Sequence, residues 1–286
     1  MIQSFDVSSH RRLLEQFLVE DTGGCDVTTA ATVRYDQQAA GRFVAKAPMV
    51  LAGLDIALEI FALLDPQFSA KPLRREGERL APGDEPAEMR GRARALLSGE
   101  RVALNLLQRL CGIATLTRMY ADAVAGTKAE IFDTRKTTPG LRALEKYAVT
   151  VGGGRNHRWG LYDAVLVKEN HIRMAGGAGR AARAVREIKD RVQFVEVEVT
   201  TIEELKEVIN ESPGMILLDN MAPGVVAEAV ELVRASGKKI LLEASGRITL
   251  ANAREYAEAG VDRISIGALT HSAPAADISL EIEPLK

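Results

Sequence analysis

Beyond residue 128, short apolar runs alternate with helical patterns along the chain. The runs are AEIFDT, DAVLVKEN, QFVEVEV, MILLDN, KILLEAS and DRISIG. After the first two intervals they recur roughly every 20 to 30 residues, which is the scale of one strand and its crossover helix. This alternation predicts βαβ units and a parallel sheet. Six such units favour an α/β barrel that is two units short of the complete eightfold form.

A doubly wound open sheet is the alternative architecture for the same pattern. Nucleotide-binding sheets of that kind carry a GxGxxG turn after a strand, where the glycines let the backbone approach a pyrophosphate. None of the six strand-like runs is followed by that turn. The sequence therefore disfavours a dinucleotide fold.

The first hundred residues have a different texture. Apolar residues at helical spacing predict an amphipathic helix over 9–20, and short strand-like runs between Pro and Gly residues over 39–97 predict a small antiparallel α+β unit. Ser98 is a suitable N-cap for a long helix that ends at about residue 125. We expect this helix to join two domains.

Composition excludes several classes of protein. Hydrophobic residues make up 47% and charged residues 27% of the 286, which is typical of a globular chain and not of a disordered one. The formal net charge of -2 gives no general attraction to nucleic acid or to an anionic membrane. Cys25 and Cys111 lack disulfide or zinc spacing, and no secretory signal or run of 18 apolar residues occurs. We expect a cytoplasmic protein without nucleic-acid or membrane partners.

Polar residues follow nearly all six predicted strands. Barrel enzymes keep their catalytic groups at the carboxyl ends of the strands, so these positions are the candidates for chemistry. A Gly/Asn/Asp turn is the ordinary alternative for any one strand end, but it does not account for all six together. The candidate positions are Asp133 to Lys136, Lys168 to His171, Glu198, Asp219 with Asn220, Glu243 with Ser245 and Gly246, and Gly267.

Two basic segments stand out among these loops. In DTRKTTPG, Thr138 and Pro139 predict a helix start, which would place Arg135 and Lys136 beside a positive helix terminus suited to carboxylate or phosphate. In GGGRNHR, His157 and Arg158 follow three glycines that allow close backbone approach to a ligand. A solvated basic turn and a surface histidine are the structural alternatives.

Acidic residues are candidate partners for these cations. Lys168 ends an apolar strand and needs an anionic partner, for which Glu198 and Asp219 are available, although a buried structural ion pair explains Lys168 and Glu198 as well as catalysis does. Glu196 lies two residues before Glu198, on the same face of the strand, and we expect it to lie deeper and to be structural.

Small residues before helix starts suggest a phosphate site in the last two loops. In barrels the corresponding loops commonly bind phosphate through backbone N–H groups. Ser245, Gly246 and Gly267 are the residues that we expect there, although many such loops bind nothing.

Seven segments together resemble quinolinate phosphoribosyltransferases. They run in order from about residue 98 to 280, and the first 97 residues match more loosely. The segments are ERVALNLLQRLCGIATLT, DTRKTTPGLRALEKYAV, GGGRNHRWGLYDAVLVKENHI, VEVEV, LLDNM, LEASG and VDRISIGALTHS. The resemblance implies an α/β protein with an incomplete barrel of about six parallel strands over 114–272. It also implies an N-terminal α+β sandwich domain over 1–113, which the C-terminal segment 273–286 joins.

The resemblance also implies an activity and a set of site residues. Such enzymes convert quinolinate and phosphoribosyl pyrophosphate to nicotinate mononucleotide, pyrophosphate and CO2 in de novo NAD synthesis, with magnesium. Glu198 and Asp219 match an acidic pair near the ribose and the metal, and as candidate catalytic residues they join Lys136 and Lys168. The implied substrate-binding residues are Arg101, Arg135, Lys136, His157, Arg158, Lys168, Glu198, Asp219, Ser245, Gly246, Gly267 and His271.

A homodimer with a shared active site follows from the same resemblance, because Arg101 matches a residue that the neighbouring subunit contributes. Three rival hypotheses stay open at this point. A molybdenum-associated relative shares the barrel and part of the GGGRNHR region but lacks the lysine at position 168. A Schiff-base aldolase would use Lys168 or Lys136 as its nucleophile. A non-catalytic anion-binding module would have no use for the carboxylates of Glu198 and Asp219.

Overall fold

The computed structural model describes residues 5–285, which form two compact units. The first unit comprises Met1–Leu116, Ala143–Gly153 and Ala273–Lys286, and the second comprises Thr117–Arg142 and Gly154–Ser272. The sequence prediction kept 114–272 together, whereas the contacts group residues 143–153 with the first unit. The outermost residues of predicted domain 1–113 and of segment 273–286, which are residues 1–4 and 286, lie outside the described residues.

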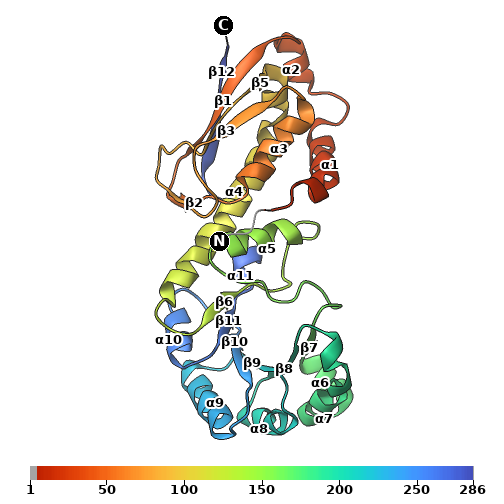
Figure 1. Ribbon diagram of the computed structural model, residues 1–286, viewed down its shortest axis with the longest axis vertical. Coiled ribbons are helices and arrows are strands. Elements are labelled where there is room, and N and C mark those ends of the chain that lie inside the picture. Colours follow the sequence, from red (N-terminus) through yellow and green to blue (C-terminus); the bar gives the residue numbers. More distant parts are fainter. Residues whose placement is uncertain (1–4, 286) are drawn as a thin grey trace. The chain divides into compact units, whose positions relative to one another are not determined.

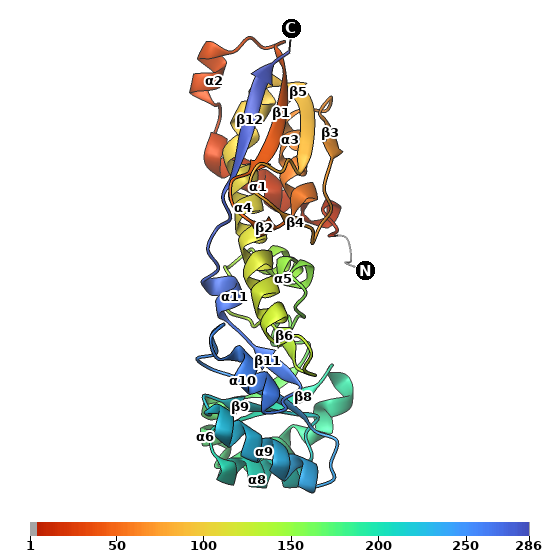
Figure 2. The ribbon, with the colours of Figure 1, turned by 90° about the vertical axis from the view of Figure 1, so that its left-hand side faces the viewer.

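An antiparallel sheet forms one layer of the first unit (Figure 2). Its strand order is β12-β1-β5-β3, so the C-terminal strand pairs with β1, and Phe43 lies opposite Leu280. The strands are β1 (Gln38–Ala45), β3 (Ser69–Pro72), β5 (Ala87–Arg92) and β12 (Ile278–Pro284), with a separate pair β2 (Met49–Val50) and β4 (Arg79–Leu80). The helices that lie wholly or mainly in this unit are η1 (Ser8–His10), α1 (Arg11–Thr22), α2 (Val27–Thr32), α3 (Leu54–Leu64), α4 (Ala93–Ala123) and α5 (Arg142–Val151).

Helix α4 begins earlier than the sequence suggested. Its first residue is Ala93, directly after β5, so Ser98 lies inside the helix and the predicted N-cap was wrong. The RARALL segment is rich in strong helix formers, which allows the helix to start at the end of the strand. The Ser98 hydroxyl instead donates a hydrogen bond of 2.9 Å to Asp26, whose other oxygen caps α2.

Six parallel strands form the sheet of the second unit (Figure 1). Their order is β6-β11-β10-β9-β8-β7, and all six predicted strands are present, which confirms the incomplete barrel. The strands are β6 (Glu130–Phe132), β7 (Val165–Val167), β8 (Val195–Val199), β9 (Met215–Asp219), β10 (Leu241–Ser245) and β11 (Arg263–Ser265). The helices are α6 (Glu169–Ala175), α7 (Ala178–Ala184), η2 (Arg186–Arg191), α8 (Ile202–Glu211), α9 (Pro223–Ala235), α10 (Ala253–Glu258) and α11 (Ala268–His271).

Alternation along β8 determines which side chains face the inside of this sheet. All five residues of VEVEV are buried, as expected for a parallel strand that is covered on both faces. Because successive side chains point to opposite faces, Glu196 and Glu198 share one face. Glu198 lies at the pocket edge, whereas Glu196 is 0% exposed. The expectation that Glu196 lies deeper is therefore confirmed.

The segment after β6 contains a turn where the sequence suggested a helix start. The N–H of Leu141 donates to the carbonyl of Thr138, and Gly140 has a positive φ of 84°. Pro followed by a positive-φ Gly defines a type II turn, so Thr138 is not an N-cap and α5 begins only at Arg142. The proposed stabilisation of Arg135 and Lys136 by a helix terminus at Thr138 was wrong. Among the described residues, no helix is long and apolar enough to cross a membrane.

Candidate active site

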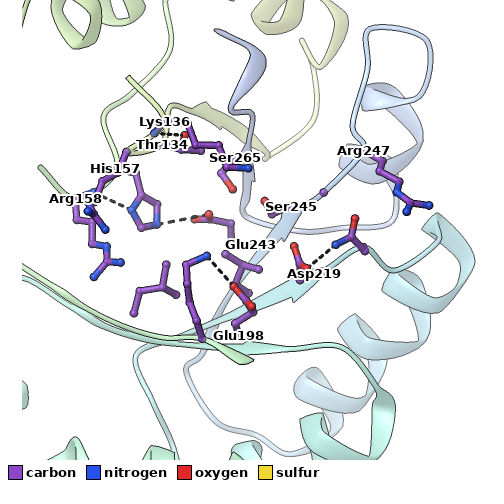
Figure 3. Close-up of a pocket in the computed structure, with 16 residues that line it drawn as sticks. Thr134, Lys136, His157, Arg158, Glu198, Asp219, Glu243, Ser245, Arg247 and Ser265 are labelled. Atoms are coloured by element: carbon purple, nitrogen blue, oxygen red, sulfur yellow. Dashed lines mark hydrogen bonds and ion pairs between the residues drawn. The ribbon is translucent and has the colours of Figure 1, made fainter. Parts of the chain in front are cut away.

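A cavity of about 600 Å³ lies at the carboxyl ends of the parallel strands in the second unit (Figure 3). Side chains from β7, β8, β9, β10 and β11 and from the loops after β6 and before β7 contribute to it. The residues that line the cavity are Thr134, Arg135, Lys136, His157, Arg158, Leu166, Lys168, Glu198, Leu217, Asp219, Asn220, Glu243, Ser245, Gly246, Arg247 and Ser265. The sequence predicted a site at this edge of the sheet.

Two arginines from separate loops give the cavity its positive wall. Arg158 is only 6% exposed, and its guanidinium donates to the carbonyl of Ala164. Burial, and next the charge of Arg135, lower the pKa of Arg158. The buried Nε of Arg135 has no hydrogen-bond partner among the described residues. Like charges held together with an unused donor favour binding of an anion in the cavity.

Acidic side chains line the opposite part of the cavity. Lys168 Nζ lies 3.0 Å from Glu198 Oε2, so Glu198 is the partner that the sequence suggested. The Lys168 side chain is 51% exposed, and the ion pair therefore contributes about 1 kcal/mol or less. Asp219 accepts a hydrogen bond of 2.6 Å from Asn220. Burial, followed by the charge of Glu198, raises the pKa of Asp219.

Unusual backbone geometry marks the loops after β9 and β10. Asn220, Gly246 and Arg247 have positive φ values of 56°, 92° and 54°. A side chain at Gly246 would collide with Asn220, so the close approach of these two loops requires glycine. Ser245 ends β10 at the same corner of the cavity. Such a bent backbone beside a small hydroxyl suits a phosphate group.

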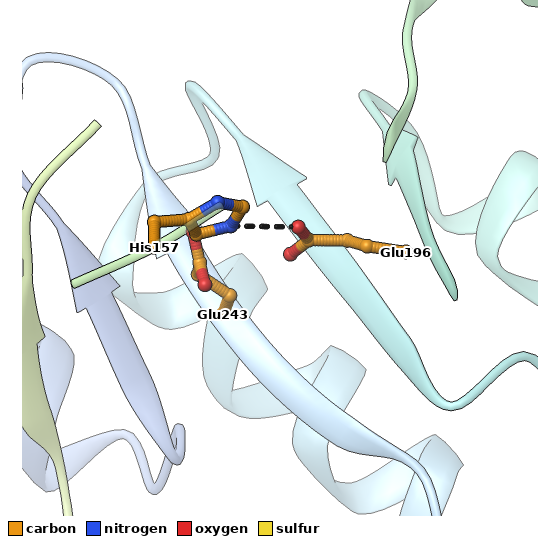
Figure 4. A group of neighbouring side chains, drawn as sticks. All are labelled: His157, Glu196 and Glu243. Atoms are coloured by element: carbon orange, nitrogen blue, oxygen red, sulfur yellow. Dashed lines mark hydrogen bonds and ion pairs between the residues drawn. The ribbon is translucent and has the colours of Figure 1, made fainter. Parts of the chain in front are cut away.

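A buried histidine and two buried glutamates lie below the cavity edge (Figure 4). His157 Nε2 lies 2.9 Å from Glu196 Oε2 and 3.6 Å from Glu243 Oε1, and both carboxyl groups are 0% exposed. The three residues offer metal-ligand atoms within 4.8 Å of one another.

The hydrogen bonds of His157 determine which of its nitrogens carries the proton. The backbone N–H of Arg158 donates to His157 Nδ1 at 2.8 Å, and a backbone N–H can only donate. The neutral ring therefore has its hydrogen on Nε2, which donates to Glu196. Because a metal would need the lone pair of Nε2, this arrangement favours a hydrogen-bonded cluster over a metal centre. The ring is buried, so the alternative of a surface histidine was wrong, whereas its role as a substrate ligand stays a prediction for a residue that lines the cavity.

Burial also determines the charge of the two glutamates. It raises the pKa of Glu196 to about 8, against the charges of Arg263, Arg158 and Lys168. Burial and then the charge of Glu196 raise the pKa of Glu243 to about 8. Ser265 is the hydrogen-bonding neighbour of Glu243, and Glu196 Oε1 has no hydrogen-bond partner among the described residues. Burial therefore favours the protonated form of both groups, which lowers the negative charge below the cavity.

Most predicted site residues lie together, and a few lie elsewhere. Arg135, Lys136, His157, Arg158, Lys168, Glu198, Asp219, Ser245 and Gly246 line the cavity. Gly267 and His271 do not line it but lie beside Lys136, since a Cβ at Gly267 would meet both side chains. Arg101 is an exposed residue of α4 and belongs to the first unit.

Several lining residues were absent from the predicted set. These are Thr134, Leu166, Leu217, Asn220, Glu243, Arg247 and Ser265. Thr134, Asn220 and Glu243 stood in the strand-end pattern, so their positions were a usable signal. Leu166, Leu217 and Ser265 lie within or at the ends of strands and looked like ordinary core residues.

The fold and the site together define a class of protein. It is an α/β protein with a polyanion site, containing both cations and carboxylates, at the carboxyl edge of an incomplete parallel barrel. The family model for the quinolinate phosphoribosyl transferase C-terminal domain matches residues 113–281, and the one for the N-terminal domain matches residues 26–111. The chain belongs to the quinolinate phosphoribosyltransferase family.

Individual relatives cover nearly the whole chain. The probable nicotinate-nucleotide pyrophosphorylase [carboxylating] of Synechocystis sp. is 45% identical over 94% of this chain and 91% of its own length. The Mycobacterium leprae nicotinate-nucleotide pyrophosphorylase is 43% identical over 99% of this chain and 100% of its own. The crystal structure of NadC from Streptococcus pyogenes is 36% identical and has a TM-score of 0.93, with 99% of this chain and 100% of that chain covered.

Proposed function

We propose that this protein is a quinolinate phosphoribosyltransferase of the decarboxylating type, acting in NAD biosynthesis. It would join quinolinate to phosphoribosyl pyrophosphate and release pyrophosphate, CO2 and nicotinate mononucleotide. The observation that carries the proposal is one cavity that is lined both by Arg135, Lys136 and Arg158 and by the carboxylates of Glu198 and Asp219. Family membership supports the same reaction.

The positive wall is assigned to quinolinate. Each of its two carboxylates gains roughly 1.5 to 3 kcal/mol from a charge-assisted hydrogen bond. Arg135, Lys136, Arg158 and Lys168 supply donors from three separate loops. His157, Glu196 and Glu243 would form the floor of the cavity. The neutral His157 ring is hydrogen-bonded to Glu196 and would hold the backbone of Arg158 in place. Orientation by fixed cations would hold the ring nitrogen toward the ribose.

The acidic edge is assigned to the transition state at the ribose. As the bond to pyrophosphate breaks, C1 gains positive charge, which Glu198 and Asp219 can stabilise more than they stabilise the neutral ground state. The ring nitrogen attacks C1. The positive charge of the resulting pyridinium then stabilises the electron pair left on the adjacent ring carbon when its carboxylate departs as CO2, and a proton from water takes the place of the carboxylate. Ser245 and Gly246, with Gly267 and His271 beside Lys136, would receive the 5-phosphate of the donor.

Magnesium fits the oxygen donors at this edge. Burial and then the charge of Glu198 raise the pKa of Asp219, so a cation held beside both carboxylates would relieve their repulsion. Glu198 and Asp219 are the residues that would hold it. When bound, magnesium neutralises charge on the pyrophosphate leaving group.

The rival hypotheses are less well supported. Lys168 Nζ lies 3.0 Å from Glu198 Oε2 and is engaged in an ion pair, whereas a Schiff-base aldolase needs an amine that is free to attack its substrate. Lys168, which the molybdenum-associated relatives lack, is present. A purely anion-binding protein would have no use for the acidic edge.

An enzymatic assay tests the activity directly. Purified protein with quinolinate, phosphoribosyl pyrophosphate and magnesium should form nicotinate mononucleotide and CO2. Nicotinate in place of quinolinate is the matched control and should give no comparable turnover. Activity that survives complete chelation of divalent metal would remove magnesium from the proposal.

We also propose a cytoplasmic homodimer in which Arg101 completes the site of the partner subunit. Arg101 is exposed on α4 and does not line the cavity of its own chain, which is the arrangement expected of a donated residue. Mixing an inactive Arg101→Ala subunit with an inactive Lys136→Ala subunit should restore activity, because one site of each mixed dimer keeps both residues. Confirmed mixed dimers without activity would contradict the shared site.

A further inference from the structure

The two loops that carry the arginines need a structural link, because their charges repel. Arg135 belongs to the loop after β6, and Arg158 belongs to the loop before β7. An anion between them would hold the loops together, but before it binds the repulsion acts to separate them. Some other contact must therefore keep both guanidinium groups in place.

Arg142 makes this contact. Its Nη1 donates to the carbonyl of Trp159 at 2.8 Å, and its Nε donates to Thr137 Oγ1 at 3.0 Å. A longer bond of 3.4 Å joins Nη2 to the carbonyl of Arg135. One guanidinium thus binds the backbone of Arg135 itself and of the residue that follows Arg158.

The acceptors of Arg142 are all neutral oxygens among the residues that the structure describes. Other arginines of the chain pair with carboxylates, as Arg109 does with Glu145. A carboxylate near Arg142 would lower the positive potential of the loops and compete with the anionic substrate for Arg135. Carbonyl and hydroxyl acceptors fix the geometry and leave the positive charge in place.

Other bonds also join or brace these loops. Asp133 accepts from the N–H of His157, Asp163 accepts from the N–H groups of Trp159 and Gly160, and Thr270 donates to the carbonyl of Lys136. Arg142 links the two cation-bearing loops through its side chain alone. Because this side chain is half-buried, it can be replaced without leaving a cavity in the core.

We propose that Arg142 is a positioning residue that joins the Arg135 and Arg158 loops into one binding surface for the dicarboxylate. This inference rests on the proposed function. It concerns a residue that does not line the cavity and acts through the residues that do. Its removal should weaken quinolinate binding more than it slows the chemical step, since the acidic edge is untouched.

The test uses Arg142→Ala and Arg142→Lys in the full-length protein. Arg142→Ala should raise the quinolinate KM, and the Kd measured by calorimetry, by about tenfold or more, which is the loss of about one charged hydrogen bond. The KM for phosphoribosyl pyrophosphate and kcat should change less. The quinolinate KM of Arg142→Lys should lie between those of the wild type and Arg142→Ala, because one ammonium cannot span three acceptors. The matched control is Arg254→Ala, which removes an arginine that also donates to a carbonyl, that of Ala125, and should leave these constants unchanged.

The possible outcomes are distinct. Unchanged quinolinate affinity in both Arg142 variants would overturn the proposal. A lower kcat together with equal rises in both KM values, and a lower Tm in both Arg142 variants, would assign Arg142 to general stability. That result would also overturn the proposal. A wild-type protein that neither binds nor converts quinolinate would instead contradict the proposed function, independently of Arg142.

Discussion

Glu198 and Glu196 lie on the same face of β8, two residues apart, yet they have different surroundings. Glu198 lies at the edge of the cavity and pairs with the half-exposed Lys168. Glu196 is fully buried, accepts a hydrogen bond from a neutral histidine and has its pKa raised to about 8. The ion pair at the edge is therefore open to solvent and ligand, whereas burial at the floor favours the protonated form of Glu196. One residue type serves two purposes because depth in the barrel determines its charge.

This difference explains how strongly anionic substrates can bind in a cavity that lies above two buried glutamates. If Glu196 and Glu243 were ionised, they would repel quinolinate and phosphoribosyl pyrophosphate from below. Their protons remove that repulsion, while Glu198 and Asp219 remain close to where positive charge develops. Substitutions at the edge should therefore change kinetics, and substitutions at the floor should change the pH dependence of stability.

The largest effect is expected at the acidic edge. Glu198→Gln removes a charge that stabilises the cationic ribose and should lower kcat by about a hundredfold or more, as loss of one preorganised electrostatic group commonly does. The quinolinate KM should change far less. Glu130→Gln, at an exposed carboxylate that pairs with Arg155, is the matched control. A Glu198→Gln enzyme with normal kcat would remove the difference in role between edge and floor.

A smaller effect is expected on the positive wall. Arg158→Ala should raise the quinolinate KM by roughly 10- to 100-fold, which corresponds to the loss of one or two charge-assisted bonds. Arg155→Ala, three residues earlier, removes an exposed arginine that does not line the cavity. If both variants gave the same KM, the effect would come from general charge and not from a specific contact.

The smallest effect on kinetics is expected at the floor, where the main change concerns the pH dependence of stability. The raised pKa of Glu243 means that the folded state holds a proton that the unfolded state releases above about pH 4.5. This contribution to stability is complete below about pH 4.5 and is lost as the pH rises through about 8. Wild-type stability should fall by about 1.4 kcal/mol per pH unit for each such proton.

Glu243→Gln isolates that proton, because the amide cannot ionise. The variant should show a shallower decline in the free energy of unfolding between pH 5 and pH 8, measured by urea denaturation. Its stability relative to wild type should increase with pH. The same pH slope in both proteins would show that Glu243 is already ionised in the native state.

The strands and the edge of the site could be predicted because their signals are local. Apolar runs identify the strands, and parallel strands bring their carboxyl ends to one edge, so Lys168, Glu198 and Asp219 had to lie near one another. The division of the N-terminal third into short strands and helices was predicted in outline. The type II turn at Pro139 was missed because Thr-Pro is also a common helix start.

The place of His157 beside the buried glutamates could not be predicted from local signals. The inward position of His157 depends on bonds with Glu196 on β8 and with the backbone of Arg158, and no sequence spacing specifies which way its ring faces. Arg142 is similar, since its three acceptors lie in loops that only the fold brings together. Such long-range hydrogen bonds become visible only in the structure.

The most direct test of the central claim is a crystal structure of the protein with quinolinate bound. The account predicts that the two carboxylates lie within hydrogen-bonding distance of donors from both loops, with Arg135 and Lys136 on one side and Arg158 on the other. The ring nitrogen should face Glu198 and Asp219. Quinolinate bound elsewhere, or in this cavity without contact to either arginine, would contradict the account.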